Sequence, residues 1–174
     1  MVNVVAVNVE VLCIGNELLI GKIENTNAFW LAKQVTASGA NLTRVAVIQD
    51  IIPEIAAAIN EVISRKPKFV ITTGGLGPTF DDKTLQGVAA ALNRKLAVNP
   101  VALEFVKEQI IEYCRKRGLP SEVELTAPRL KMATFPEGTE VVNNPVGTAP
   151  ALRVDVAGTV LFALPGIPSE MEAI

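Results

Sequence analysis

The stretch TTGGLGPTFDDKT, residues 72–84, decides the fold and marks the candidate site. It begins at the end of an apolar run, residues 69–73, that is typical of a short buried strand. Its three glycines can adopt positive φ angles, so consecutive backbone amides can point at one anion. The adjacent aspartates Asp81 and Asp82 should repel that anion. A divalent cation resolves the conflict, because Mg²⁺ prefers one or two carboxylates together with phosphate oxygens of a ligand.

A simpler interpretation of the same loop is a tight turn from strand to helix, with Asp81 or Asp82 as the helix cap. Capping accounts for one aspartate, but not for both together with Thr79 and Thr84. The run GGLGPT is not a dinucleotide-binding fingerprint, because Phe80 occupies its third glycine position. Both interpretations, capping and metal-assisted phosphate binding, remain open at this point.

The residues around this loop alternate between strand and helix patterns. Apolar runs bounded by turn residues predict strands, and apolar residues at helical spacing predict helices. The expected strands cover residues 7–14, 41–48 and 69–73, and the expected helices run from Asn25 or Thr26 to 38, from Pro53 onward, and over 83–92. This alternation predicts an α/β fold with a mostly parallel sheet between two layers of helices.

The second half of the chain adds longer helices and a pair of late strands. The expected helices cover residues 100–117, with Leu103, Val106, Ile110 and Tyr113 on one apolar face, residues 121–131, and a short segment from Pro168. Strands at residues 151–156 and 159–164 are separated by a turn at Gly158. This spacing predicts a hairpin, and therefore at least one antiparallel strand.

Composition favours one domain with an aliphatic core. The chain has 174 residues, of which 49% are hydrophobic and only 5% aromatic. The net charge of −2 disfavours nucleic-acid binding, and the basic run at residues 115–117 is expected to be a solvated helix end. The sequence shows no signal-peptide or membrane-span pattern, so a cytoplasmic protein is expected.

The chain contains no histidine and two cysteines, Cys13 and Cys114. The missing histidine excludes Ser-His-Asp and Cys-His nucleophilic catalysis in their usual form. The cysteines form no CxxC pattern, so neither a zinc site nor a disulfide framework is expected, and Cys13 should be buried in the first strand. Catalysis would therefore rely on carboxylates, lysine, backbone dipoles or a metal ion.

Three loops should meet at the carboxyl edge of the sheet, where open α/β sheets bind ligands. They are residues 15–24, 74–82 and 165–169. The first of them, GNELLIGKI, is not a P-loop, because five residues separate its glycines and Ile23 replaces the required Ser or Thr. The segment VVNNPVGTAPAL, residues 141–152, offers further amide and hydroxyl groups, although an ordinary turn-rich connection also explains it.

Four segments in this order, GNELLIGKIENTN, TTGGLGPTFDDKT, NNPVGTAP and LPGIPSEM, resemble the molybdopterin-binding MoaB/MogA-like domain. The likeness is strongest to the amino-terminal domain of the competence/damage-inducible CinA proteins. It covers almost the whole chain and implies a three-layer α/β/α sandwich as a single domain over residues 1–174. The nicotinamide-nucleotide deamidase domain that full CinA proteins often carry is not expected here.

The resemblance also implies roles for residues at matching positions. Asp82, with help from Asp81, is the expected metal-binding and catalytic acid, and Glu17 is the acid of the first loop. Ligand contacts are expected at Gly15, Asn27, Asp50, Thr73, Gly74, Gly75, Gly77, Thr79, Thr84, Asn144, Gly147, Thr148, Pro165, Gly166 and Ser169. The chain departs from the family patterns at Asn16, Ala151 and Ile167. The apolar Ile167 stands where adenylylating relatives have a polar Asn, which favours the CinA pattern.

Three functions follow from these observations. CinA-type domains are associated with metal-dependent hydrolysis of ADP-ribose and related pyrophosphates, so the leading expectation is such a hydrolase using Mg, Mn or Co. The alternative is a molybdopterin-binding protein of molybdenum cofactor biosynthesis, because MoaB/MogA-type relatives bind molybdopterin and activate it by adenylylation. The third is a non-catalytic scaffold. The expected partners are a nucleotide or pterin phosphate and, as in relatives, further copies of the chain in a dimer or trimer, with no nucleic acid and no membrane.

Overall fold

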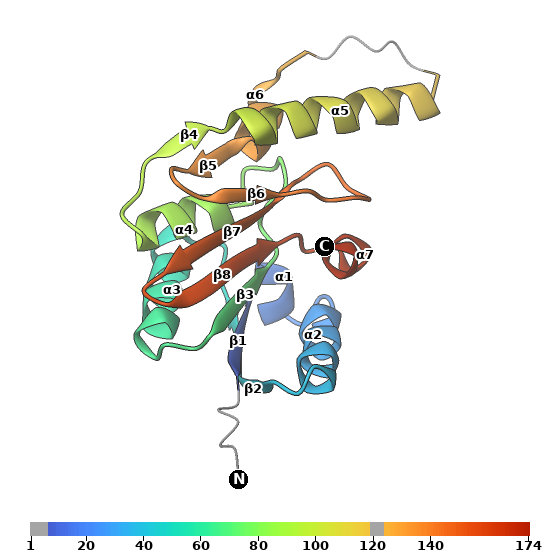
Figure 1. Cartoon of the computed structure of the whole chain (residues 1–174). Helices are drawn as coiled ribbons and strands as arrows, with labels where there is room; N and C mark the ends of the chain where they lie inside the picture. Colours follow the sequence, from blue (N-terminus) through green and yellow to red (C-terminus); the bar gives the residue numbers. More distant parts are fainter. Residues whose placement is uncertain (1–6, 119–123) are drawn as a thin grey trace.

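The structure is a computed structural model, and it describes residues 7–118 and 124–174. Figure 1 shows the course of the chain. The elements in chain order are β1 (Asn8–Ile14), α1 (Asn16–Leu19), α2 (Thr26–Ala37), β2 (Asn41–Ile48), α3 (Ile52–Ser64), β3 (Phe69–Thr73), α4 (Thr84–Ala91), β4 (Leu96–Val98), α5 (Pro100–Lys116), α6 (Ala127–Met132), β5 (Thr134–Pro136), β6 (Glu140–Val142), β7 (Ala151–Val156), β8 (Thr159–Leu164) and α7 (Pro168–Ala173).

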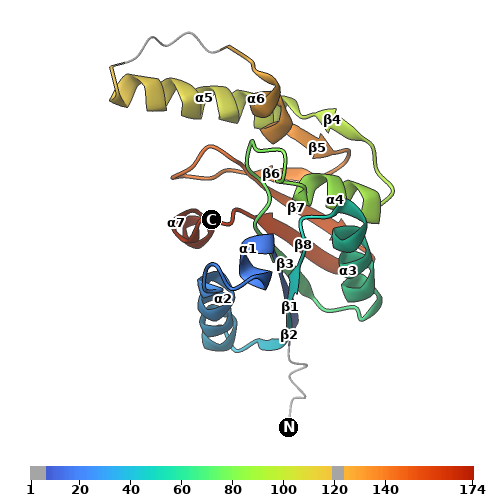
Figure 2. The same cartoon turned by 180° about the vertical axis from the view of Figure 1, so that it is seen from behind.

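A six-stranded sheet forms the centre of the molecule, with strand order β2-β1-β3-β8-β7-β6. The pairs β1–β2, β1–β3 and β3–β8 are parallel, whereas β7 runs antiparallel to both β8 and β6. Helices α3 and α4 cover one face, and α2 and α7 cover the other (Figure 1 and Figure 2). The predicted three-layer fold, the mostly parallel sheet and the β7–β8 hairpin are therefore confirmed.

Alternating side chains of β1 divide the core between the two faces of this sheet. Leu12 and Ile14 pack into the cluster that includes Ile55 of α3. Val11 and Cys13 face the other cluster, which includes Leu31 of α2. Successive residues of a strand point to opposite faces, so a strand buried on both faces is apolar throughout. The expected burial of Cys13 is confirmed, since its side chain is fully buried.

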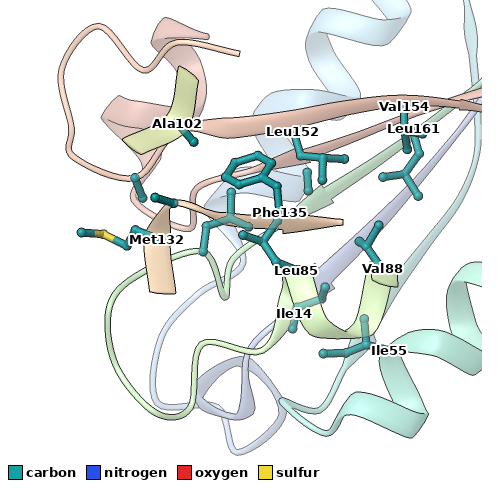
Figure 3. Packing of buried hydrophobic residues seen from close by; sticks show 14 of the residues in the cluster. Ile14, Ile55, Leu85, Val88, Ala102, Met132, Phe135, Leu152, Val154 and Leu161 are labelled. Carbon is teal, nitrogen blue, oxygen red and sulfur yellow. The ribbon is translucent and has the colours of Figure 1, made fainter. Parts of the chain in front are cut away.

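A smaller lobe packs on one edge of this core and was not predicted as a unit. Strands β4 and β5 form an antiparallel two-stranded sheet, and α5 and α6 lie beside it (Figure 1). Phe135 of β5 is buried in the same cluster as Leu85 of α4 and Leu152 of β7 (Figure 3). The lobe therefore shares its core with the main sheet.

Several short elements differ from the sequence-based expectation. Strands β4, β5 and β6 have three residues each, and α1 has four, within a segment expected to be a loop. Such short segments carry no readable periodicity. The predicted helix over residues 121–131 is wrong in extent, because α6 begins only at Ala127, with Pro128 in its first turn. Proline suits a first turn but not a helix interior; residues 121–123 lie outside the described part of the chain.

The end of α5 extends beyond the core. Tyr113 was expected on the apolar face, but it is 48% exposed, since the last buried residue of this helix is Ile110. Arg115 and Lys116 are exposed and pair with Glu112, which confirms the solvated helix end. Among the residues that the structure describes, no helix is long and apolar enough to cross a membrane.

Candidate functional site

A pocket of about 550 Å³ lies at the carboxyl ends of β1, β3 and β8, where the sequence predicts that three loops meet. The predicted site residues that line it are Gly15, Glu17, Asn27, Asp50, Thr73, Gly74, Gly75, Gly77, Asp81, Asp82, Thr148, Pro165 and Gly166. Five others lie outside the lining, namely Thr79, Thr84, Asn144, Gly147 and Ser169. The first four of these shape the loops around the pocket, and Ser169 is exposed on α7.

The glycine loop after β3 is fastened at its first residue. The Gly74 amide donates to Leu164 O at 3.0 Å, and the buried Thr84 hydroxyl donates to Gly74 O at 2.7 Å. Gly74 has φ 99°, and a Cβ there would lie 2.2 Å from Ile14 O. Because its N–H is already engaged, Gly74 does not supply an amide for a phosphate. The role of Thr84 is to hold the first residue of the loop in place through this hydrogen bond.

The next three amides of the loop are the donors left for a ligand. The N–H groups of residues 75, 76 and 77 have no hydrogen-bond partner within residues 7–118 and 124–174. All three residues line the pocket. Gly75 has φ 69°, but Gly77 does not have a positive φ, so that part of the prediction is wrong. Gly77 leaves space instead, since a Cβ there would lie 2.7 Å from Asp82 Oδ2 and would have to displace that carboxylate.

Asp82 caps the turn of this loop rather than a helix. Its Oδ2 accepts the Thr79 amide at 2.8 Å and also the Thr79 hydroxyl. Helix α4 begins after Lys83, whose side chain makes no capping hydrogen bond. The expected capping of a helix by Asp81 or Asp82 is therefore wrong. The Asp82 carboxylate binds Thr79 in the preceding turn, and among the described residues no side chain caps α4.

Carboxylates dominate the charge of the pocket. The acidic residues in its lining are Glu17, Glu24, Asp50, Asp81, Asp82 and Glu170, and no Lys or Arg belongs to the described lining. Among the described residues, however, no three His, Cys, Asp or Glu side chains are placed to hold a metal ion together. A cation bound at these carboxylates would therefore have to use oxygen atoms of the ligand as well.

Asp50 shows the effect of this acidic surrounding. Its Oδ2 accepts the Asn16 amide at 2.8 Å. Burial raises the pKa of Asp50 from its ordinary 3.8, the Asn16 hydrogen bond opposes this, and the charges of Glu17, Asp81 and Asp82 raise it further. The folded state therefore binds this proton more tightly than the unfolded state.

Replacing Asp50 with asparagine should change the pH dependence of stability. The pKa of Asp50 is higher in the folded state than in the unfolded state. Its contribution to the free energy of unfolding is therefore complete at a pH below the unfolded-state pKa, and it is lost as the pH rises through the folded-state pKa. Asp50→Asn keeps an acceptor for Asn16 and should remove this loss. Urea unfolding between about pH 4 and pH 7 should show a shallower fall than in the wild type. Glu108→Gln at an exposed position of α5 is the control, and an unchanged slope for Asp50→Asn would contradict the assignment.

Two asparagines hold the remaining loops. Buried Asn144 donates from Nδ2 to Ala149 O at 3.0 Å and to Glu170 Oε2 at 2.6 Å, and it accepts from the Gly147 amide at 2.9 Å. Asn27 donates to Gly166 O at 2.8 Å, while its buried Oδ1 has no partner in the described part of the chain. Glu170 was missed by the sequence analysis, because a single glutamate in the first turn of a helix carries no signal of a site.

Comparisons with known proteins show the family to which the chain is related. A family model described as a probable molybdopterin binding domain matches residues 10–174. A protein of Metallosphaera sedula is 45% identical over 165 residues, which cover 95% of this chain and 59% of that relative. The chain spans a similar share, 58% and 60%, of the next relatives, from Aeropyrum pernix and Sulfurisphaera tokodaii.

Solved structures show the same fold. The protein CinA from Thermoplasma acidophilum, described as having unknown function, matches with a TM-score of 0.83 and 39% identity, covering 97% of this chain and 93% of that chain. The molybdopterin biosynthesis enzyme MoaB from Thermus thermophilus matches with a TM-score of 0.61 and 16% identity, covering 95% and 85%. At this identity the likeness to MoaB concerns the fold alone. The chain therefore belongs to the family of probable molybdopterin-binding domains, of the CinA type.

Proposed function

We propose that the pocket binds a phosphorylated pterin of the molybdopterin class. The observation that carries this proposal is the row of unengaged amides at residues 75–77, which line the pocket directly after a strand. Successive backbone N–H groups of this kind form a concave anion site. The pocket volume of about 550 Å³ suits a ligand of this size.

Asn27 supports a heterocyclic ligand next to the phosphate. Its Oδ1 is a buried acceptor without a partner in the described residues, although the residue lines the pocket. Buried polar atoms are almost always satisfied, by protein, water or ligand. A pterin carries ring N–H and amino donors that can satisfy this oxygen after a small adjustment of the side chain.

Calorimetric titration with molybdopterin, with ADP-ribose as the comparison, tests this proposal. We expect the wild type to bind the pterin. Asn27→Ala should bind it at least about 10-fold more weakly, because the variant lacks the side-chain oxygen that accepts a hydrogen bond from the ligand. Asn143→Ala removes the same type of side chain from an exposed position outside the lining and should bind like the wild type. Equal affinities for the wild type and Asn27→Ala would contradict the role of Asn27, and no pterin binding at all would contradict the function.

Hydrolysis of a nucleotide pyrophosphate such as ADP-ribose is a second candidate, favoured by the acidic lining. The six carboxylates of the lining would repel a diphosphate, unless it arrives with Mg²⁺, Mn²⁺ or Co²⁺. Asp82 and Asp81 are the carboxylates of the glycine loop that such a cation would meet first. Asp82→Asn keeps an acceptor for Thr79, so it should fold while losing turnover. If the wild type releases no AMP from ADP-ribose with any of these metals, this candidate fails and pterin binding, or a non-catalytic scaffold, remains.

Self-association into a dimer or trimer stays a prediction, which sedimentation analysis of the purified chain would test.

A further inference from the structure

Lys131 reaches the glycine loop from outside the six-stranded sheet. It lies on α6 in the smaller lobe and is half-buried. Its Nζ donates to the carbonyl oxygen of Gly77 at 2.8 Å. The loop that lines the pocket is therefore contacted by an ammonium group, although no Lys or Arg of the described residues belongs to the pocket lining.

A second hollow of about 330 Å³ places this ammonium next to the pocket. The hollow shares Gly75, Leu76 and Asp82 with the pocket, and Lys131 is the basic residue of its lining. The two cavities thus meet at Gly75 and Leu76, whose amides have no hydrogen-bond partner within the described residues. An anion bound to those amides would therefore border both the acidic pocket and the hollow that Lys131 lines.

The energetics of Lys131 also favour an anion nearby. Burial lowers the pKa of Lys131 from its ordinary 10.5, while Asp82 and Asp81, the charged groups that face it, raise it again. A lysine ammonium has three N–H donors. Within the described residues it makes one hydrogen bond, to Gly77. A half-buried ammonium group that has unused N–H donors is stabilised when a further acceptor, such as a phosphate oxygen, binds to it.

We propose that Lys131 binds the phosphate of the ligand together with the amides of residues 75–77. The inference rests on the proposed function, because it requires a phosphorylated ligand at the glycine loop. It gives the smaller lobe a role at the site, since α6 supplies a positive charge to a pocket whose described lining contains no Lys or Arg. The purely structural alternative is that Lys131 only fastens the loop through Gly77.

Binding of inorganic pyrophosphate, measured by calorimetry near neutral pH, tests the proposal. Lys131→Met keeps the aliphatic stem and removes the charge, and it should bind at least about 10-fold more weakly, the effect expected for loss of a charge-assisted hydrogen bond. Lys131→Arg should largely retain the affinity. Lys95→Met removes the same charge from an exposed position outside both cavities and should behave like the wild type. Thermal unfolding of each variant shows whether it is folded.

A pH profile separates a phosphate ligand from a structural contact. As pH rises through the lowered pKa of Lys131, the ammonium loses its charge, so wild-type affinity should fall on the alkaline side. Lys131→Arg stays protonated there and should show no such fall. This comparison decides the matter even if Lys131→Met does not fold.

The outcomes separate this inference from the function on which it rests. Weaker pyrophosphate binding by Lys131→Met, or an alkaline fall that only Lys131→Arg abolishes, supports the proposal. If the wild type binds the pterin and pyrophosphate, and both variants match it at every pH, the role of Lys131 is wrong and the proposed function stands. If the wild type binds neither ligand, both are wrong.

Discussion

Replacing Gly74 with alanine is expected to lower the free energy of unfolding by about 3 kcal/mol or more, from the sum of backbone strain and overpacking. Gly74 has φ 99°, a region that residues with a Cβ rarely adopt. The added Cβ would also lie 2.2 Å from Ile14 O, which is backbone of the neighbouring strand. Urea unfolding measures the loss directly.

The loop cannot move away from this contact at little cost. The amide and carbonyl of Gly74 are bonded to Leu164 and Thr84, so a shift would break buried hydrogen bonds. Gly166 also packs closely, since a Cβ there would lie 3.1 Å from Gly74 Cα. We therefore expect Gly74→Ala to disturb the pocket and to lose ligand binding as well as stability.

Gly158→Ala is the matched control for this prediction. Gly158 has φ 87°, but nothing lies within 4 Å of the position of an added Cβ. Its loss should reflect the backbone conformation alone, about 1–2 kcal/mol. If both variants lose the same stability, the close approach of Gly74 to β1 is unimportant.

Replacing Arg65 with methionine is the second large expected effect, a loss of about 3 kcal/mol of stability. Arg65 pairs with Glu10 of β1 through Nε to Oε1 at 2.9 Å and Nη2 to Oε2 at 2.6 Å. The side chain of Glu10 is only 5% exposed, whereas that of Arg65 is 28% exposed. Removal of the guanidinium leaves a buried carboxylate without its partner, which is the costly case for an ion pair.

Arg153→Met provides the comparison. Arg153 binds two carboxylates, at 2.6 Å to Glu140 and 2.7 Å to Asp155, and these are 65% and 60% exposed. Solvated pairs of this kind contribute about 0–1 kcal/mol, so this variant should unfold nearly like the wild type. Adding Glu10→Gln to Arg65→Met should recover part of the loss, because the buried charge is gone. No recovery, or equal losses for Arg65→Met and Arg153→Met, would show that burial of Glu10 does not decide the effect.

Arg65→Met should leave ligand binding intact in the folded fraction. Glu10 lies in the first half of β1, whereas the pocket begins at Ile14, the other end of the strand. Pyrophosphate titration at a temperature where the variant is folded measures this. A loss of affinity would mean that the two ends of β1 are coupled.

Patterns that repeat along the chain predicted the frame of this molecule. The apolar runs of β1 and β3 and the helical spacing of Ile55, Ile59 and Val62 in α3 follow from burial of strands and helix faces, which local sequence reveals. The glycine loop identified the edge of the sheet where the pocket lies. The three-residue strands and Glu170 were missed, since neither a strand of three residues nor a single carboxylate leaves a periodic pattern.

By itself, then, the sequence determined the layered α/β architecture, the parallel centre of the sheet and the loops that meet at its carboxyl edge, because hydrophobic periodicity and turn residues act over neighbouring positions. Only the tertiary structure decided how each loop residue is used. In the folded chain, the Gly74 amide donates to Leu164 and the Asp82 carboxylate accepts from Thr79. Lys131 donates to Gly77, which lies 54 positions away in the sequence. These contacts depend on packing between distant elements, and no local preference specifies which donor meets which acceptor.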